Sequence, residues 1–409
     1  MRKLPGKKIF QEKPSITVAD ILNVNYTYEW TNEFNPPEIL SSLQEYIKIF
    51  VAMEDRDALI VALWVMHSWC CEESLRCPLL LINAPERECG KTQLLKIVQK
   101  LVPKPFETAN ITLAGLFRII SNYAPTLLID EADTFMEGKA EMQGIINKGY
   151  ERGGVVLRIE SDGLRMKECV YQVYGPKVLA GIMLERHLPD ATMSRGIQIP
   201  LRRKPRSVSV ESLRNVSDSA CSGMRSRMRF FAELNKAAIA QGCQWESMPS
   251  SLSDRQKDNW EPLLAVARCC GEEWYQKALE AALQNCSETS PPKSSANQLL
   301  EDIREVLMGY EGNYIPSADL LEKLHEHPDM DWSTYNRGQP ITARQLAKFM
   351  SAYGIKSKTV RMKEGYTPKG YEVREFGDAF TRYLAEREDD PVEEKKTPPA
   401  NWKPTRPNF

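Results

Sequence analysis

Apolar residues repeat at helical spacing over residues 37–71, the first stretch of the chain with a clear pattern. The repeat is carried by Leu40, Leu43, Ile47, Leu59, Leu63 and Met66. A period of about 3.6 residues places such side chains on one buried face of a helix. The pattern predicts a pair of helices here, after a polar, proline-bearing N-terminal arm over residues 1–37.

Beyond residue 75 the pattern changes to short apolar runs that alternate with helical stretches. The runs "PLLLINA", "TLLIDEAD", "KVLAGIM" and "SRGIQIPLRR" are predicted strands. The stretches "LAGLFRIISNY" and "KTQLLKIVQKLV", which is ended by Pro103, are predicted helices. Apolar strands that alternate with helices are typical of a parallel sheet covered on both faces. The predicted fold class of this region is α/β.

Two features interrupt that alternation between residues 139 and 175. A helix is predicted around residues 139–151, ending at Gly153-Gly154. The segment "VVLRIESDGLRMKECVYQVY" then has two strand-like runs around Asp-Gly, a pair favoured in tight hairpin turns. The sequence therefore predicts a β-hairpin inserted between "TLLIDEAD" and "KVLAGIM".

The C-terminal half is predicted to be helical over residues 206–285 and then to form a separate small domain. The segment "SETSPPKSSAN", residues 287–297, has the composition of a linker. The tail mixes charge with proline and is predicted to be disordered. The predicted parts are an arm (1–37), a helical N-terminal region (38–75), an α/β core (76–205), a helical lid (206–290), a C-terminal domain (291–385) and the tail (386–409).

The segment "INAPERECGKTQLL", residues 82–95, joins a predicted strand to a predicted helix. Its Gly90-Lys91-Thr92 is the ending of a phosphate-binding loop (P-loop). Such a loop aims backbone N–H groups at an anion near a helix N-terminus, while its lysine reaches the phosphates and the next hydroxyl ligates Mg²⁺. The predicted ATP-binding residues are Pro85, Glu86, Arg87, Glu88, Cys89, Gly90, Lys91, Thr92 and Gln93.

Pro85 stands where the usual pattern G-x-x-x-x-G-K-[ST] has glycine. Proline fixes φ near −65° and removes one N–H donor, whereas the phosphate contacts come mainly from N–H groups nearer Gly90. We therefore expect a working loop with a stiffer entry and a negative φ in its first turn.

The partner motif is "TLLIDEAD", in which four residues of strand pattern end in Asp130-Glu131. In P-loop ATPases with an additional strand, the first acid holds the water shell of Mg²⁺ and the second polarises the attacking water. The alternative is a buried strand whose two acids cap the next helix. Together with the P-loop, the motif favours a nucleotide site with Mg²⁺ at Thr92 and Asp130, and with Lys91 and Glu131 as catalytic residues.

Two arginines are further catalytic candidates. Arg195 lies between two predicted strands, where ring ATPases place an arginine that acts on a neighbouring subunit's nucleotide. Its alternative is a surface arginine or a salt-bridge partner. Arg255, in "SDRQKDNWEPLL", is a candidate lid arginine that senses the γ-phosphate, and its alternative is a helix N-terminus capped by Ser253 or Asp254.

Several sequence blocks occur together in one known family. They are "APERECGKT", "LLIDEAD", "NKGYERGG", "YGPKVLAGI", "LPDATMSRGIQIPLRR", "SDRQKDNWEPLLAVA" and a C-terminal pattern that begins "LLEDIREVL". In these blocks the chain resembles the ATPase domain called domain of unknown function 3631, found in phage, prophage and plasmid proteins of primase–helicase type. The resemblance covers about residues 40–385, and Pro85 is a feature of the family's loop.

The resemblance implies an AAA+-like core, similar to superfamily 3 helicases of phage and plasmid replication. It further implies an oligomeric ring, such as a hexamer, that moves DNA. One departure is that "KVLAGIM" ends without the polar residue that usually senses the γ-phosphate. Whether Lys177 or a later residue takes that role is left open.

The C-terminal domain is predicted to be a winged helix, with "TARQLAKFM" as recognition helix after the N-cap Thr342 and "SKTVRMKEGYTPKGYEVR" as wing. Nine basic residues stand against two acidic ones over residues 337–374. Such a patch suits the phosphate backbone of DNA, and the alternative is a winged helix used for protein contacts. The candidate DNA-binding residues here are Arg344, Lys348, Lys358 and Arg361.

The predicted hairpin carries Arg158, Arg165 and Lys167. Related helicases place a channel-lining hairpin at this point of the chain, so these side chains are candidates for gripping single-stranded DNA. The alternative is a set of solvent-facing charges.

Composition adds few constraints. The 409 residues carry a formal net charge of −1, with 42% hydrophobic and 27% charged residues, as in ordinary soluble proteins. With no signal peptide or long apolar run, the protein is predicted to be cytoplasmic and to make no membrane contact. The ten cysteines lack metal-ligand spacing and are predicted to be reduced, mostly buried thiols.

The leading hypothesis is an ATP-driven DNA helicase or translocase that uses ATP and Mg²⁺. It would act as a homo-oligomeric ring on single-stranded or forked DNA in mobile-element replication. Whether it acts alone or beside a separate primase or regulatory partner is left open. The alternative is a nucleotide-switched DNA-binding regulator or loader, in mobile-element control or phage defence. A transcription factor with an ATPase appendage is a weaker hypothesis, because no activation motif is present.

Overall fold

The computed structural model describes residues 35–162, 165–215, 218–243, 248–289, 295–327, 330–336, 338–359 and 367–384. The chain divides after Ser290 into two compact units, residues 1–290 and 291–409. The predicted tail, nearly all of the predicted arm and the turn of the predicted wing lie outside the described residues. None of the described helices is long and apolar enough to cross a membrane.

The first unit is built on a five-stranded parallel sheet, as the alternating pattern predicts. Its strands are β1 (Leu79–Ala84), β2 (Pro105–Thr108), β3 (Thr126–Ile129), β6 (Lys177–Ile182) and β7 (Gly196–Pro200). Their order is β2-β3-β6-β1-β7. One strand, β6, therefore lies between the strand that leads into the P-loop and the strand that ends in the acidic pair.

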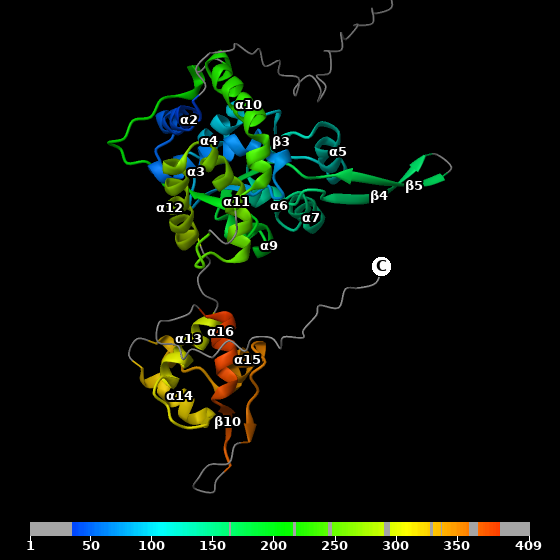
Figure 1. Cartoon of the computed structure of the whole chain (residues 1–409). Coiled ribbons are helices and arrows are strands. Elements are labelled where there is room, and N and C mark those ends of the chain that lie inside the picture. The colour runs from blue at the N-terminus through cyan, green and yellow to red at the C-terminus, as the bar shows by residue number, and fades with distance from the viewer. Residues whose placement is uncertain are drawn as a thin grey trace, which may run out of the picture. The chain divides into compact units, whose positions relative to one another are not determined.

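Helices cover both faces of this sheet (Figure 1). On the face that carries Leu80 and Ile82, the helices are α2 (Pro36–Phe50), α3 (Asp55–Ser68), α4 (Lys91–Leu101), α10 (Asp218–Gln241), α11 (Asp254–Cys269) and α12 (Glu272–Thr289). On the face that carries Leu79 and Leu81, they are α5 (Leu113–Tyr123), α6 (Ala132–Met136), α7 (Ala140–Lys148), α8 (Leu184–His187) and α9 (Asp190–Met193). Two 3₁₀ turns, η1 (Cys71–Glu73) and η2 (Leu213–Asn215), join these elements.

Helix α3 is the centre of the first layer, because its sequence has no polar face. Every residue from Asp57 to Ser68 is buried, and a helix that is apolar all round belongs in a core. It packs on α2, α11 and α12, so the predicted N-terminal region and the predicted lid share one hydrophobic core. Trp64 Nε1 donates to the carbonyl O of Pro78 at 2.8 Å, which ties α3 to the start of β1. All ten cysteines are free and eight are buried.

The edge strand β2 was not predicted from the sequence. It begins with Pro105, pairs only with β3, and none of its residues is fully buried. An edge strand tolerates proline because its N–H groups face away from the ladder, and partial burial leaves no apolar run to detect.

The predicted hairpin is present as β4 (Val155–Asp162) and β5 (Arg165–Gln172), paired antiparallel. It projects from the core beside α5 (Figure 1). Its contacts with helices include those of β5 with α5 and of β4 with α7. Residues 163 and 164, at its turn, are not among the described residues.

The second unit follows the order helix, strand, helix, helix and two strands, closed by a last helix. Its elements are α13 (Ser295–Leu307), β8 (Tyr314–Pro316), α14 (Ser317–Glu326), η4 (Asp331–Ser333), α15 (Ala343–Ala352), β9 (Lys358–Thr359), β10 (Lys369–Glu372) and α16 (Arg374–Tyr383), with sheet order β8-β10-β9. The predicted N-cap Thr342 is confirmed, since its hydroxyl accepts the Gln345 N–H in a capping box. Strand β8 was not predicted.

Candidate functional site

The loop between β1 and α4 makes its sharp turns in its second half, close to α4. Glu88 and Gly90 have positive φ, at 64° and 86°, and Pro85 is not among the positive-φ residues. The first turn therefore suits proline, and the position that needs glycine is Gly90, at the N-terminus of α4. This geometry agrees with the expectation for Pro85.

Lys91 is the first residue of α4. Its Nζ donates to the carbonyl O of Glu86 at 3.1 Å, so the ammonium lies over the turn that the loop encloses. The first N–H groups of an 11-residue helix and its dipole face the same turn. The loop thus concentrates backbone donors and one cation at the end of β1, which is an anion-binding arrangement.

Thr92 and Asp130 meet although they come from different elements. Thr92 Oγ1 lies 3.5 Å from Asp130 Oδ2, and Asp130 Oδ1 accepts the N–H of Glu131 at 2.9 Å. Mg²⁺ holds oxygen ligands at about 2.0–2.1 Å, so two adjacent ligands lie roughly 3 Å apart. The two oxygens fit a shared hydrated Mg²⁺. Among the described residues, no group of three or more His, Cys, Asp or Glu could hold a metal ion.

Glu131 follows at the tip of β3 with a left-handed backbone, φ 52° and ψ 42°. Its carbonyl O accepts the N–H groups of Thr134 and Phe135 at 3.1 and 2.8 Å, which starts α6. The Glu131 side chain makes no capping hydrogen bond and is exposed. The helix-capping alternative is therefore not what this side chain does, and non-glycine residues with such φ cluster at functional sites.

A side-chain amide at the same edge was missed in the sequence. Asn83, near the end of β1, accepts the Leu184 N–H at 3.0 Å and donates to Glu185 Oε2 at 2.8 Å. It lies opposite Gly181 of β6, the strand whose tip lacks a polar residue. The signal was the single polar residue inside the apolar run "PLLLINA".

Lys177 does not lie at this edge. It begins β6, so it stands at the opposite end of the sheet from the P-loop. Its buried Nζ donates to the carbonyl O atoms of Gly149, Val173 and Gly175 at 3.1, 3.0 and 2.7 Å. Burial lowers its pKa to about 8. Lys177 fixes the backbone at the base of the hairpin. Because it lies at the opposite end of the sheet from the P-loop, it cannot sense the γ-phosphate of a nucleotide bound at that loop.

Arg195 also lies at the end of the sheet away from the P-loop. Its carbonyl O accepts the N–H of Leu79, the first residue of β1. Its guanidinium donates to the carbonyl O of Ala191 within the preceding turn. Along β1, at about 3.3 Å per residue, the loop starts roughly 20 Å away. Arg195 therefore cannot reach phosphates bound at the loop of its own chain.

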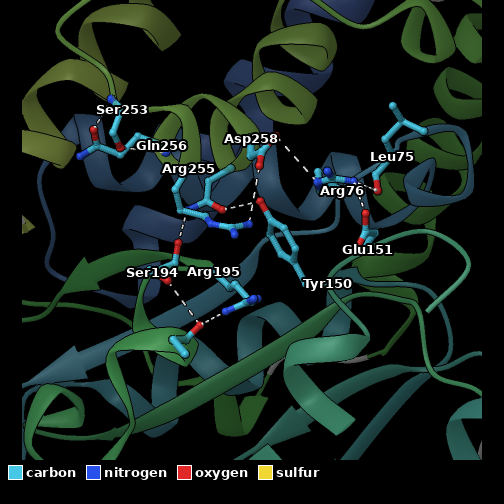
Figure 2. Close-up of polar contacts among 12 residues, drawn as sticks. Leu75, Arg76, Tyr150, Glu151, Ser194, Arg195, Ser253, Arg255, Gln256 and Asp258 are labelled. Carbon is cyan, nitrogen blue, oxygen red and sulfur yellow. Dashed lines mark hydrogen bonds and ion pairs between the residues drawn. The ribbon is translucent and has the colours of Figure 1, made fainter. Parts of the chain in front are cut away.

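Arg255 lies beside Arg195. Helix α11 is capped by Ser253, as one alternative predicted, and the Arg255 guanidinium lies 5.4 Å from the Tyr150 ring centre. Both arginines line a cleft of about 380 Å³ (Figure 2). Its other lining residues are Arg76, Gly144, Asn147, Lys148, Tyr150, Glu151 and Asp258. The sequence analysis named Arg195 and Arg255 for two separate roles, the structure brings them together in this arginine cleft, and the cations Arg76 and Lys148 were missed.

Of the predicted DNA-binding side chains of the hairpin, Arg158 and Lys167 are described, and each has an acidic neighbour. The Arg158 guanidinium lies 5.3 Å from the Phe117 ring centre and 4.0 Å from Glu141 Oε2. Lys167 is the cross-strand neighbour of Glu160, and the side chain of Arg165 is outside the described residues. The opposite face of the hairpin carries five exposed apolar side chains: Val155, Leu157, Ile159, Met166 and Val170.

In the second unit, Arg344 and Lys348 lie one turn apart on α15, and both are exposed. Neither has an ion pair with any described residue. Lys358 is different, since its Nζ lies 3.1 Å from Glu372 Oε2 and 2.5 Å from Glu375 Oε1. Arg361 lies outside the described residues.

The fold and the site define a parallel α/β protein with a glycine loop at a helix N-terminus and an acidic pair at a nearby strand tip. Residues 200–383 match the family model described as protein of unknown function (DUF3631). This match is narrower than the resemblance, which covered about residues 40–385 and included the P-loop.

Known proteins give three further likenesses. The chain is 33% identical over 134 residues to the "Uncharacterized 28.9 kDa protein in xis 5'region" of Saccharopolyspora erythraea, covering 32% of this chain and 50% of that protein. The chain thus matches about half the length of this curated relative. A full-length MCM homolog from Methanopyrus kandleri has a TM-score of 0.40 at 13% identity, over 62% of this chain and 60% of its own. The NrS-1 C-terminal region has a TM-score of 0.40 at 14% identity, over 89% of this chain and 79% of its own. Both structural likenesses are remote.

Proposed function

We propose that the protein is an ATPase that binds ATP and Mg²⁺ at the P-loop and hydrolyses ATP there. The observation that carries the proposal is the approach of Thr92 Oγ1 to Asp130 Oδ2, at 3.5 Å, beside Lys91. Three groups that P-loop chemistry requires, a cation, a hydroxyl and a carboxylate, come together from two strand tips. Chance placement of surface charges does not account for this convergence.

Each residue would have a distinct role in hydrolysis. The loop N–H groups and Lys91 would bind and orient the phosphates, and Thr92 and Asp130 would hold the hydrated ion that neutralises them. Glu131, whose exposed carboxylate follows Asp130 at the strand tip, would accept a proton from the attacking water. Asn83 would position the turn after β6 next to that water.

We further propose a homo-oligomer in which the arginine cleft of one chain faces the P-loop of the next. Arg195 lies about 20 Å from its own loop, by the length of β1, and Arg255 lies beside it in the cleft. A nucleotide that these arginines contact would therefore be one held by another chain. An interface between different ends of identical chains is heterologous and closes into a ring when its rotation permits. An ATP-driven DNA helicase or translocase is the activity that such a ring, with a cationic helix in the second unit, supports best.

The test is a pair of loop variants. Lys91→Ala is expected to abolish ATP binding, because the phosphates lose their main cation. Glu131→Gln is expected to keep ATP bound and to lower hydrolysis by about 10²-fold or more, because the general base is lost. Fluorescent-nucleotide titration and phosphate release would measure the two effects, and unchanged turnover in Lys91→Ala would overturn the site.

The response of the protein to DNA distinguishes a motor from a nucleotide-switched regulator. A helicase should hydrolyse ATP faster with single-stranded DNA and should unwind a forked duplex. A nucleotide-switched regulator or loader should bind DNA with an affinity that depends on nucleotide and should unwind nothing.

A further inference from the structure

The residues that line the arginine cleft carry more positive than negative charge. Arg76, Lys148, Arg195 and Arg255 line it, against Glu151 and Asp258. Its volume of about 380 Å³ lies within the range of sites that hold small ligands. A cleft of this size with four cations and two carboxylates suits an anion rather than an apolar ligand.

Arg76 is placed in the cleft by the backbone. Residues 75–77 run antiparallel to residues 150–152, with the N–H of Arg152 bonded to the Leu75 carbonyl O at 3.0 Å and that of Cys77 to the Tyr150 carbonyl O at 2.8 Å. Position 76 therefore faces the cleft because of the fold and not because of a chance rotamer.

Tyr150 lies among Arg76, Arg195 and Arg255 (Figure 2). Its ring centre lies 6.0 Å from the Arg76 guanidinium and 5.4 Å from that of Arg255. Its hydroxyl donates to Asn259 Oδ1 at 2.8 Å, and Asn259 Nδ2 donates to the carbonyl O of Ser194 at 3.0 Å, next to Arg195. The Tyr150 ring and the Asn259 amide are buried, so the core holds in place the groups that these arginines contact or adjoin.

We propose that the arginine cleft binds the phosphate chain of the nucleotide held by a second copy of this chain, and that Arg76 is a third arginine of that composite site. This inference rests on the proposed ATPase function. Arg76 lies just before β1. Like Arg195, it is therefore at the end of the sheet away from the P-loop of its own chain. Planar guanidinium groups suit phosphate oxygens because each can donate two parallel hydrogen bonds.

Two carboxylates hold Arg76 in the cleft. Its Nη1 lies 3.1 Å from Glu151 Oε1, and its Nε lies 3.8 Å from Asp258 Oδ1. Glu151 is half exposed, and partly exposed ion pairs are weak, whereas arginine–phosphate pairs are strong. A phosphate chain can therefore take Arg76 from the carboxylates, and Arg76 would respond to the nucleotide state of the neighbour.

The test mixes variants of the full-length protein. Arg76→Ala is expected to bind fluorescent ATP as the wild type does, because its P-loop is intact, and to lose roughly tenfold in kcat or more. Mixed with the inactive Lys91→Ala variant, it should regain activity, because Lys91→Ala chains supply Arg76 to the intact loops of Arg76→Ala chains. Arg195→Ala should behave in the same way.

Arg268→Ala is the matched control, since Arg268 lies on α11 and stacks 4.2 Å from the Tyr275 ring, outside the cleft. Its kcat should be unchanged. If Arg76→Ala keeps full kcat while Arg195→Ala loses it, the inference about Arg76 fails and the ATPase proposal stands. If Arg76→Ala is inactive and mixing does not restore it although mixing restores Arg195→Ala, Arg76 is only structural and the inference fails. Absence of hydrolysis in the wild type would instead overturn the proposed function.

Discussion

Single residues at this site are specified by backbone conformation as much as by chemistry. Gly90 has a φ of 86°, which side chains other than glycine adopt at a cost, whereas Pro85 stands where φ is negative. The unusual proline is thus compatible with the loop because the sharp turns come later, at Glu88 and Gly90. A motif search that insists on the first glycine would discard this loop for a position at which the geometry does not need it.

His67 gives a residue-scale prediction about pH. It is fully buried in α3, its Nε2 lies 3.3 Å from Ser74 Oγ, and burial lowers its pKa from 6.5 to about 3. Between these values the unfolded chain takes up a proton that the folded chain does not. The stability that neutral His67 contributes is therefore complete above pH 6.5 and is lost as the pH falls. At pH 5 the loss is about 2 kcal/mol.

Urea unfolding followed by tryptophan fluorescence at pH 7 and pH 5 would measure this loss. His67→Phe is the comparison, since it keeps a ring in the core and removes the titrating group. Its free energy of unfolding should fall by about 2 kcal/mol less between the two pH values than that of the wild type. Equal losses in both proteins would contradict the assignment.

At the scale of elements, the hairpin β4–β5 is two-sided. One face packs on α5, where the Tyr171 ring lies 4.6 Å from that of Phe117 and Arg118 Nη2 donates to Glu160 Oε1 at 2.6 Å. The other face exposes its apolar residues, with Leu157 54% and Ile159 62% accessible. Two strands alone are only marginally stable in water, so the face on α5 is what holds the hairpin.

Substitutions on the two faces should differ. Leu157→Lys should change the free energy of unfolding by no more than about 0.5 kcal/mol, because the side chain is exposed. Tyr171→Ala should cost roughly 1–2 kcal/mol, because it removes an aromatic contact and a hydrogen bond to Glu160. Thermal unfolding would compare them, and a larger loss in Leu157→Lys would mean that its face is covered.

The core elements were predictable from the sequence because each has a strong periodic pattern. The strands around "PLLLINA" and "KVLAGIM", the helix "LAGLFRIISNY" and the N-cap Thr342 all lie where predicted. Strand β2 was missed because it is short, partly exposed and begins with Pro105. The face of the hairpin on which Arg158 lies depends on packing against α5, which periodicity alone does not contain.

The site was predictable where the chemistry is local in sequence, and not where it is assembled across the fold. The P-loop and the acidic pair each lie within a few residues, so their motifs indicated the meeting of Thr92 and Asp130. Arg76 belongs to no motif. It enters the cleft only because residues 75–77 pair with residues 150–152.

On the scale of the whole molecule, the second unit offers a test of DNA binding. Arg344 and Lys348 are exposed on α15, while Lys358 is paired with Glu372 and Glu375. Replacing both Arg344 and Lys348 by Ala should weaken binding and lower the slope of log K against log salt by about 1.8 for duplex DNA, since two phosphate contacts are lost. Fluorescence anisotropy at several salt concentrations would measure this.

Lys358→Ala is the matched comparison. Removing it breaks ion pairs inside the unit, so the change should lower the melting temperature of this unit while leaving the salt slope unchanged. If Lys358→Ala reduces the slope while the double variant does not, the wing and not α15 carries the phosphate contacts.

The loop and the arginine cleft lie at opposite ends of the sheet, so turnover per chain should depend on how many chains are joined. In the proposed head-to-tail arrangement, a row of n chains would hold n − 1 complete sites when its ends are open and n when it closes, and an isolated chain would hold none. Turnover per chain should therefore rise with protein concentration and level off at closure. A small proportion of chains that lack both Lys91 and Arg195 should remove more activity than its share, because each such chain spoils two sites.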